Sequence, residues 1–246
     1  AKKDVTIEII GPLVSKPYVD LPLDLMKKFG VQVKRQGYKR FFIKAGTQYR
    51  PTRLAVEGDA SSASYFWGIG ALTNETIEIE NIPRNSLQAD LRLRQILDQG
   101  FLQPISSMAQ KNLKIDCSDF PDSAMTLAVL SAFRNGKTIL TGLSNLRIKE
   151  SDRLTAMARE LRKIGEKVRQ NPDGWEIYGN PSRLHAAAIE TYNDHRIAMC
   201  FGMAGFVIPG MKIKNQRCVE KTYPNFWKDL KALKKKSWNI NSTGSL

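Results

Sequence analysis

The chain has 246 residues, of which 42% are hydrophobic and 25% are charged. This length suits one large or two modest domains, and the composition excludes a disordered or collagen-like protein. The 38 Lys and Arg outnumber the 24 Asp and Glu, so the net charge of +14 favours an anionic partner: nucleic acid, an anionic membrane or a phosphorylated small molecule.

A pattern of strand, connector and amphipathic helix recurs along the chain. Strand-like runs at residues 5–9, 76–79 and 138–140 each precede a helical stretch, and a looser fourth copy spans residues 211–225. We expect each of the first three helices to begin at an Asp and to end before a Gly, the residues that cap helices: Asp20 and Gly30, Asp90 and Gly100, Asp152 and Gly165. Residues 31–34 and 40–44 predict a hairpin after the first helix.

A second type of helix precedes the later strands. Residues 60–72, 123–133 and 195–207 are apolar or small nearly all round, which predicts helices buried on all sides. They follow Asp59, Asp122 and Asp194, and simple N-capping is the plainest interpretation of each Asp. The repeating unit is therefore a buried helix, a strand, a surface helix and further strands.

The polar stretch at residues 45–52, which contains Gly and Pro, is the best candidate for a domain boundary. We predict part of one domain over residues 1–57 and a domain of three repeat units over residues 58–233. Residues 234–246 lack periodicity and are expected to be disordered. The buried helix that should precede residue 5 is missing, so we expect either an aberrant N-terminus or a chain that begins in the middle of a domain.

The three cysteines are far apart and form no CxxC pair. This spacing argues against a disulfide framework and against zinc, and it fits a reducing cytosol. No apolar run approaches the roughly 18 residues that a membrane span needs. We therefore expect a soluble, cytoplasmic protein.

Cations stand at three expected helix starts, where the helix dipole normally disfavours them. They are Lys149 with Arg153, Arg196 after His195, and Lys221. An anion at such a site would be held by dipole and side chains together, so the pattern predicts a site for a polyanionic small substrate. Plainer interpretations remain, because Arg153 can form a surface pair with Glu150 and His195 can be a packed core residue.

Six motifs carry a resemblance that covers residues 5–233 in order. Residues 11–20, 57–66, 121–126, 147–154, 192–199 and 221–226 closely resemble the 5-enolpyruvylshikimate-3-phosphate (EPSP) synthase family. None of the six motifs is specific alone, but together they are.

The resemblance implies an α/β (α+β) fold of enolpyruvyl transferase-like βαβαββ units with buried helices, here one near-complete domain plus part of a second. It implies transfer of enolpyruvate from phosphoenolpyruvate to the 5-hydroxyl of shikimate 3-phosphate, in aromatic amino-acid biosynthesis, with no metal, cofactor, nucleic acid or membrane. It also implies that the cationic pocket is where glyphosate binds.

Site roles follow from the resemblance, motif by motif. Asp122 resembles the base that takes the 5-hydroxyl proton, and Glu150 and Lys221 resemble the groups that transfer a proton at the phosphoenolpyruvate carbons. The residues that resemble substrate contacts are Ser15, Tyr18, Asn145, Lys149, Arg153, His195, Arg196 and Lys221.

The family's N-terminal motifs are absent. The chain is then a fragment, a split subunit that needs a complementary N-terminal polypeptide, or an incomplete enzyme, and its activity alone is open.

Other hypotheses are a relative that acts on UDP-N-acetylglucosamine, an inactive remnant that binds shikimate 3-phosphate weakly, and a basic nucleic-acid-binding module. The motifs at residues 147–153 and 194–196 favour the shikimate enzyme over the first, and intact site residues disfavour the remnant. Against the nucleic-acid module, the aromatic residues fall in apolar helices instead of alternating with cations.

Overall fold

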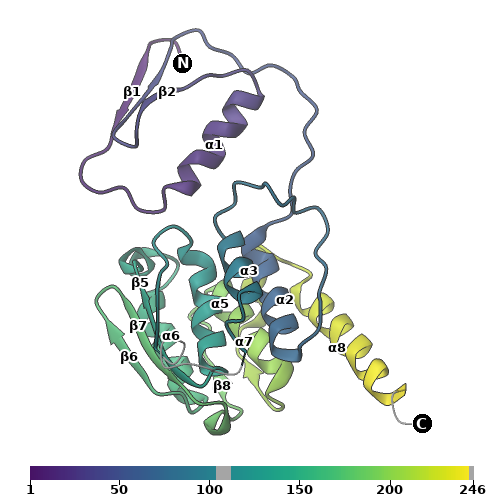
Figure 1. Ribbon diagram of the computed structural model, residues 1–246. Coiled ribbons are helices and arrows are strands. Elements are labelled where there is room, and N and C mark those ends of the chain that lie inside the picture. Colours follow the sequence, from purple (N-terminus) through teal and green to yellow (C-terminus); the bar gives the residue numbers. More distant parts are fainter. Residues whose placement is uncertain (104–111, 244–246) are drawn as a thin grey trace.

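The computed structural model describes residues 1–103 and 112–243. Two groups of elements lie apart in it, joined by residues 44–59 (Figure 1). The N-terminal lobe consists of β1 (Val5–Glu8), α1 (Pro17–Lys28), β2 (Lys34–Gln36) and β3 (Arg40–Ile43). The main lobe runs from α2 (Ala60–Thr73) to α8 (Phe226–Thr243). The mixed helix and sheet architecture agrees with the expected fold class, whereas the domain boundary at residue 57 stays a prediction.

The N-terminal lobe is a three-stranded antiparallel sheet with α1 beside it (Figure 1). β3 lies between β1 and β2, and Phe41 pairs with both Ile7 and Arg35. The expected hairpin forms between β2 and β3. Within residues 1–50, all of which the structure describes, Val31 and Phe41 alone are fully buried. This lobe therefore has a very small core of its own.

Three buried helices form the centre of the main lobe. They are α2, α5 (Pro121–Ala132) and α7 (His195–Val207), and each packs on the other two. The prediction of helices buried on all sides is confirmed, since most residues of all three are inaccessible. Small residues allow the close approach: a Cβ atom on Gly68 of α2 would lie 2.3 Å from the sulfur of Met203 on α7.

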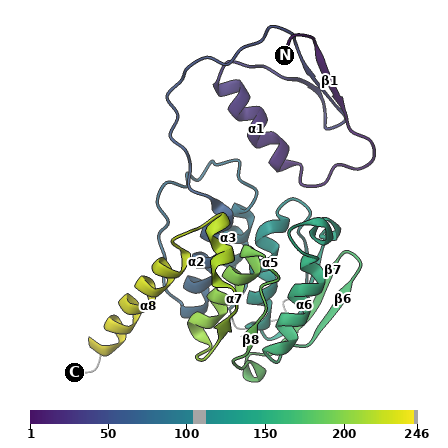
Figure 2. The same ribbon diagram turned by 180° about the vertical axis from the view of Figure 1, so that it is seen from behind.

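A four-stranded sheet covers one side of this centre. Its order is β4 (Asn112–Asp116), β5 (Gly136–Thr141), β7 (Gly174–Gly179) and β6 (Val168–Asn171), with β4 and β5 parallel and the other pairs antiparallel. Both α5 and α6 (Arg153–Lys163) pack on β7 (Figure 2). The remaining elements are α3 (Leu91–Asp98), the parallel pair β8 (Ala188–Ile189) and β9 (Lys212–Ile213), and the short helices η1 (Ser144–Ile148), η2 (Pro181–Arg183) and η3 (Gln216–Lys221).

The expected helix caps are confirmed in part. Gly30, Gly100 and Gly165 all follow helix ends with positive φ, and Asp152 accepts a hydrogen bond from the Thr155 amide. The predicted start was wrong for α1, whereas α3 does begin at Asp90 but is not capped by its side chain. Asp20 lies inside the first turn of α1, which begins at Pro17, and the Asp90 side chain makes no capping hydrogen bond. Both carboxylates are used by distant groups instead.

Two further expectations were wrong. No strand forms over residues 76–79, because a strand needs a hydrogen-bonded neighbour and none of the described residues forms one there. The tail is helical as far as Thr243, since the Lys, Leu and Ala of α8 are good helix formers and no Gly or Pro interrupts them. Residues 244–246 of the predicted tail lie outside the described residues.

The buried helices should dominate the stability of the main lobe. Leu127 on α5 is fully buried, whereas Leu87 is 49% exposed. We expect Leu127→Ala to lower the free energy of unfolding by about 3 kcal/mol through lost burial and cavity formation. The matched Leu87→Ala should cost less than about 1 kcal/mol. Urea denaturation of the two variants measures both values, and equal losses would contradict the assignment of the core.

Candidate active site

The most heavily charged part of the interior surrounds Arg153, the first residue of α6. Its side chain is 1% exposed, and its guanidinium contacts three carboxylates: Nε lies 2.8 Å from Asp194, Nη1 3.0 Å from Asp122 and Nη2 2.7 Å from Glu150. Burial lowers the pKa of Arg153, but Asp194 and Asp122 raise it above its ordinary value. The guanidinium is therefore a permanent cation that organises the three carboxylates around it.

Further cations reach the same carboxylates from other elements. Arg196 of α7 lies 3.2 Å from Asp122, and the Lys149 Nζ lies 4.0 Å from it. Lys221, at the end of η3, donates a 2.5 Å hydrogen bond to Glu150. The cations of the three expected helix starts thus meet here, but the expected position of Lys221 was wrong, because Lys221 ends η3 and α8 begins only at Phe226. With Arg153 included, the cluster contains four cations and three carboxylates. It therefore carries a surplus positive charge.

The two aspartates of the cluster differ in what they do for their helices. Asp194 is fully buried and caps α7 by accepting from the Arg196 amide at 3.0 Å. N-capping was the wrong interpretation of Asp122, because α5 begins one residue earlier with Pro121 and the cap position is Phe120. Freed from capping, the Asp122 carboxylate projects to Arg153 and Arg196.

His195 is 3% exposed and lies between these carboxylates. Burial, then the charge of Arg196, lower its pKa, so the imidazole is neutral near pH 7. Its Nδ1 lies 3.9 Å from both Glu150 and Asp194, too far for a hydrogen bond, and no group among the described residues accepts or donates there. A buried ring nitrogen without a partner can serve a ligand.

Glu150 is held as an anion by its neighbours. Burial would raise its pKa, but the hydrogen bond from Lys221 and the charges of Arg153 and Lys221 lower the pKa to about 2. With these neighbours, Glu150 therefore has no proton to donate near pH 7.

The N-terminal lobe contacts the main lobe through two residues that resemble substrate contacts. The Ser15 hydroxyl, on a residue with φ of 55°, accepts a 3.2 Å hydrogen bond from the Asn145 amide. The Tyr18 hydroxyl donates a 2.5 Å hydrogen bond to Asp90. The site residues that the resemblance implies thus lie in two places. Most belong to the charge cluster of the main lobe, whereas Ser15 and Tyr18 belong to the N-terminal lobe and face the main lobe.

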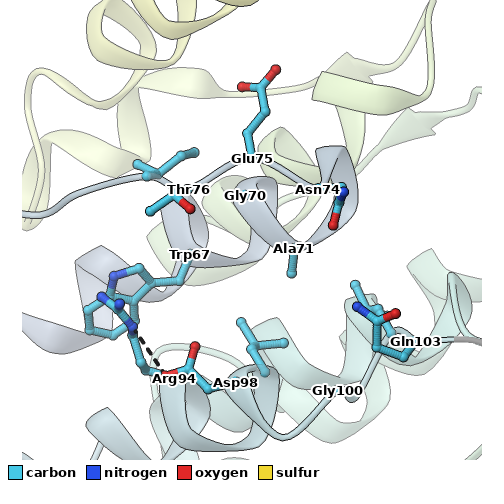
Figure 3. A pocket seen from close by; sticks show the side chains of 13 residues that line it. Trp67, Gly70, Ala71, Asn74, Glu75, Thr76, Arg94, Asp98, Gly100 and Gln103 are labelled. Atoms are coloured by element: carbon cyan, nitrogen blue, oxygen red, sulfur yellow. Dashed lines mark ion pairs between the residues drawn. The ribbon is translucent and has the colours of Figure 1, made fainter.

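A separate hollow of about 250 Å³ lies between α2 and α3 (Figure 3). It is lined by Trp67, Asn74 and Thr76 and by the ion pair of Arg94 with Asp98, and no residue of the charge cluster lines it.

The roles of two important carboxylates are not recognisable from the sequence. Asp194 was predicted only as a cap, and Asp90 was taken for a cap of α3. Asp194 binds Arg153, 41 residues away in sequence, and Asp90 binds Tyr18, 72 residues away. No local sequence pattern reveals such distant pairs.

A family model for EPSP synthase (3-phosphoshikimate 1-carboxyvinyltransferase) matches residues 1–230 of the chain. The chain belongs to the EPSP synthase family. It is 44% identical to the 3-phosphoshikimate 1-carboxyvinyltransferase of Laribacter hongkongensis, over 90% of this chain and 54% of the relative. It is 43% identical to the same-named protein of Citrobacter koseri, over 94% of this chain and 56% of the relative. The chain therefore spans a little over half the length of these relatives.

Solved structures confirm the enolpyruvyl transferase fold. An EPSP synthase from Acinetobacter baumannii superposes with a TM-score of 0.72 at 26% identity, over 92% of this chain and 56% of that one. The enolpyruvyl transferase NikO from Streptomyces tendae has a TM-score of 0.64 over 94% of this chain and 55% of its own length. Its 16% identity supports the shared fold alone.

The part of the chain that the structure describes has neither a membrane-spanning helix nor a metal-binding cluster of side chains. None of their helices is long and apolar enough to cross a membrane. In the same part of the chain, no group of three His, Cys, Asp or Glu side chains is arranged to hold a metal ion.

The low pKa of Glu150 predicts a pH-dependent contribution to stability. A carboxylate whose pKa falls from 4.5 to about 2 on folding contributes stability that is complete above pH 4.5 and is lost as the pH falls towards 2. We expect the difference in unfolding free energy between the unmutated chain and Glu150→Gln to shrink by about 1 kcal/mol per pH unit below pH 4.5. Urea denaturation between pH 6 and pH 3 measures this difference.

The matched control is an exposed carboxylate. Asp98 is 66% exposed and has a 3.6 Å ion pair with Arg94. If Asp98→Asn and Glu150→Gln showed the same pH dependence, the charge cluster would not be what lowers the pKa of Glu150.

Proposed function

We propose that the chain carries the charge cluster of a 3-phosphoshikimate 1-carboxyvinyltransferase, which transfers enolpyruvate from phosphoenolpyruvate to the 5-hydroxyl of shikimate 3-phosphate. The observation that carries the proposal is the sharing of Asp122 and Glu150 by Arg153, Arg196 and Lys221. Cations fixed by carboxylates in this way are preorganised for a substrate with a carboxylate and a phosphate. The family match supplies the identity of the substrates. The place of action would be the cytoplasm, in aromatic amino-acid biosynthesis.

Phosphoenolpyruvate would bind by exchange of ion pairs. Its carboxylate and phosphate oxygens would take over donors of Arg153, Arg196 and Lys221, so Arg153 and Lys221 would be neutralised by the substrate as well as by Glu150. Because those cations hold the Glu150 pKa at about 2, substrate anions that neutralise them would raise that pKa. Binding would thus prepare Glu150 for proton transfer. The inhibitor glyphosate, also an anion, would occupy the same cluster.

The reaction needs an addition and an elimination. In the addition, the 5-hydroxyl oxygen bonds to C2 of phosphoenolpyruvate, its proton passes to Asp122, and the methylene carbon takes a proton from Glu150 or Lys221. In the elimination, the resulting methyl group returns a proton to that same residue, the double bond re-forms and phosphate leaves with the C–O electron pair. His195 would line the pocket as a neutral hydrogen-bonding group.

Shikimate 3-phosphate would bind between the lobes. Ser15 and Tyr18 would contact it from the N-terminal lobe, and Asn145 and Lys149 from the main lobe. The 3.2 Å hydrogen bond between Asn145 and Ser15 supports this placement, because groups from both lobes already meet there.

We infer that a complementary N-terminal polypeptide of the family completes the site. The chain covers 54% to 57% of its relatives. The N-terminal lobe has few buried residues and exposes apolar side chains, among them Ile10 at 99% and Tyr49 at 62%. In the main lobe, residues 76 and 77 border the hollow of Figure 3, and residues 76–79 have no partner strand among the described residues. Such surfaces favour a further segment of chain.

Release of phosphate tests the proposed reaction. The chain, alone and mixed with the N-terminal half of the Laribacter hongkongensis relative, is given both substrates. We expect turnover in at least the mixture, and Asp122→Asn should lower it by a factor of about 100 or more through loss of the base. Asp116→Asn, on an exposed strand end, is the control and should retain turnover.

Two results would contradict the proposal at different levels. Unchanged turnover in Asp122→Asn would remove this residue from the chemistry. No turnover in either preparation would reject the reaction and favour a basic anion-binding module, for which the salt dependence of DNA binding is the next measurement.

Arg196 should discriminate between the two substrates. We expect Arg196→Ala to weaken phosphoenolpyruvate binding about tenfold or more, because a charged hydrogen-bond donor is lost, and to weaken shikimate 3-phosphate binding less than threefold. Calorimetric titration measures both affinities, with Arg94→Ala as the control, since Arg94 lines the hollow between α2 and α3 and has no ion pair with the charge cluster. Equal losses for the two substrates would contradict the clamp role.

A further inference from the structure

Asp90 is a buried carboxylate to which neither the sequence motifs nor the family match assign a role. It is 3% exposed and precedes α3, where its side chain leaves the helix uncapped. Instead it accepts three hydrogen bonds: from the Ser123 amide at 3.0 Å, the Ser61 hydroxyl at 3.0 Å and the Tyr18 hydroxyl at 2.5 Å. These donors belong to α5, α2 and α1, so Asp90 joins both lobes.

The three hydrogen bonds explain how a buried carboxylate is stabilised at this position. A buried carboxylate is costly unless it is paired or well hydrogen-bonded, and within the described residues no Lys, Arg or His side chain lies within 4.0 Å of Asp90. Three hydrogen bonds to an anion satisfy it instead. Tyr18 must remain protonated to donate, and burial, followed by the charge of Asp90, raises the Tyr18 pKa.

Two of the three hydrogen bonds of Asp90 connect it to the candidate site. Ser123 follows Asp122, so the bond to its amide fixes the first turn of α5 from which the Asp122 carboxylate projects. Tyr18 is a residue that resembles a shikimate 3-phosphate contact. Burial lowers the pKa of Arg196, but Tyr65, Asp122 and Asp90 raise it, so the charge of Asp90 also acts on the phosphoenolpyruvate side.

We propose that Asp90 is a positioning residue: it holds Tyr18 of the N-terminal lobe against the main lobe and aligns it with the start of α5, so that substrate contacts from both lobes are in register. Its effect on ligands rests on the function proposed above. Its effect on the lobes does not, because the hydrogen bond from Tyr18 joins the two lobes directly.

A double-mutant cycle tests the proposal. Asp90→Asn keeps the shape and an acceptor for Ser123 but removes the charge, and Tyr18→Phe removes only the hydroxyl. We expect each single variant to weaken shikimate 3-phosphate binding about tenfold, the scale of a lost hydrogen bond to a charged group. The double variant should bind no more than about threefold worse than either single variant, since both remove the same interaction.

The control is Asp98→Asn, the same substitution at the other end of α3, where the side chain is 66% exposed. It should leave the affinity unchanged. A purely structural role for Asp90 predicts a lower free energy of unfolding with unchanged affinity in the folded Asp90→Asn chain, and that result overturns the proposal. Losses in affinity that simply multiply in the double variant also overturn it.

Hydrogen–deuterium exchange separates failure of this inference from failure of the proposed function. If the unmutated chain, with its complementary polypeptide, binds no shikimate 3-phosphate, the proposed function fails. The amides of residues 18–21 then decide whether Asp90 holds the lobe. We expect them to exchange at least fivefold faster in Asp90→Asn than in Asp98→Asn, and equal rates overturn the proposal.

Discussion

The charge cluster depends on one buried interaction, the guanidinium of Arg153 surrounded by Asp122, Glu150 and Asp194. A cation that is 1% exposed is tolerated only because these carboxylates lie within 3.0 Å of its nitrogens. In turn, the arginine holds three like charges together that would otherwise repel one another. Removal of any member would leave an uncompensated charge in the interior, so the cluster is fixed before any ligand arrives.

The buried helices explain why this cluster forms where it does. Because α5 and α7 pack on each other in the centre and α6 packs beside them, the starts of all three helices are close together. Asp122, Arg153 and Arg196 each lie in the first two positions of their helix. Helix starts carry partial positive charge, which adds to the surplus cation and favours a polyanionic ligand. The neighbouring starts of the repeated helices thus form a site suited to an anion.

Much of the architecture could be predicted because it depends on local patterns. Helices that are apolar on all sides must be buried, and α2, α5 and α7 are. The anion site was also predicted from cations at expected helix starts, where Arg153 and Arg196 do lie but Lys221 does not. What failed depended on partners far away in sequence. Residues 76–79 have the composition of a strand but no neighbour to pair with, and Asp90 has the position of a cap but binds groups from three other elements. No local pattern distinguishes a capping Asp from one that holds a distant tyrosine.

The two lobes differ in the size of their hydrophobic cores. The main lobe has a full core, whereas the N-terminal lobe buries little more than Val31 and Phe41. The placement of the N-terminal lobe therefore depends strongly on two hydrogen bonds, one from Tyr18 to Asp90 and one from Asn145 to Ser15. Substrate held between the lobes would add to the same connection.

A crystal structure of the chain grown with shikimate 3-phosphate and phosphoenolpyruvate, together with a complementary N-terminal polypeptide, tests most directly whether the cluster exchanges its carboxylates for substrate anions. We expect substrate oxygens within hydrogen-bond distance of Arg153, Arg196 and Lys221, with at least one of the two cations that now contact Glu150 transferred to the ligand. Substrates bound elsewhere, or an empty cluster with its present ion pairs at saturating concentrations, would contradict this.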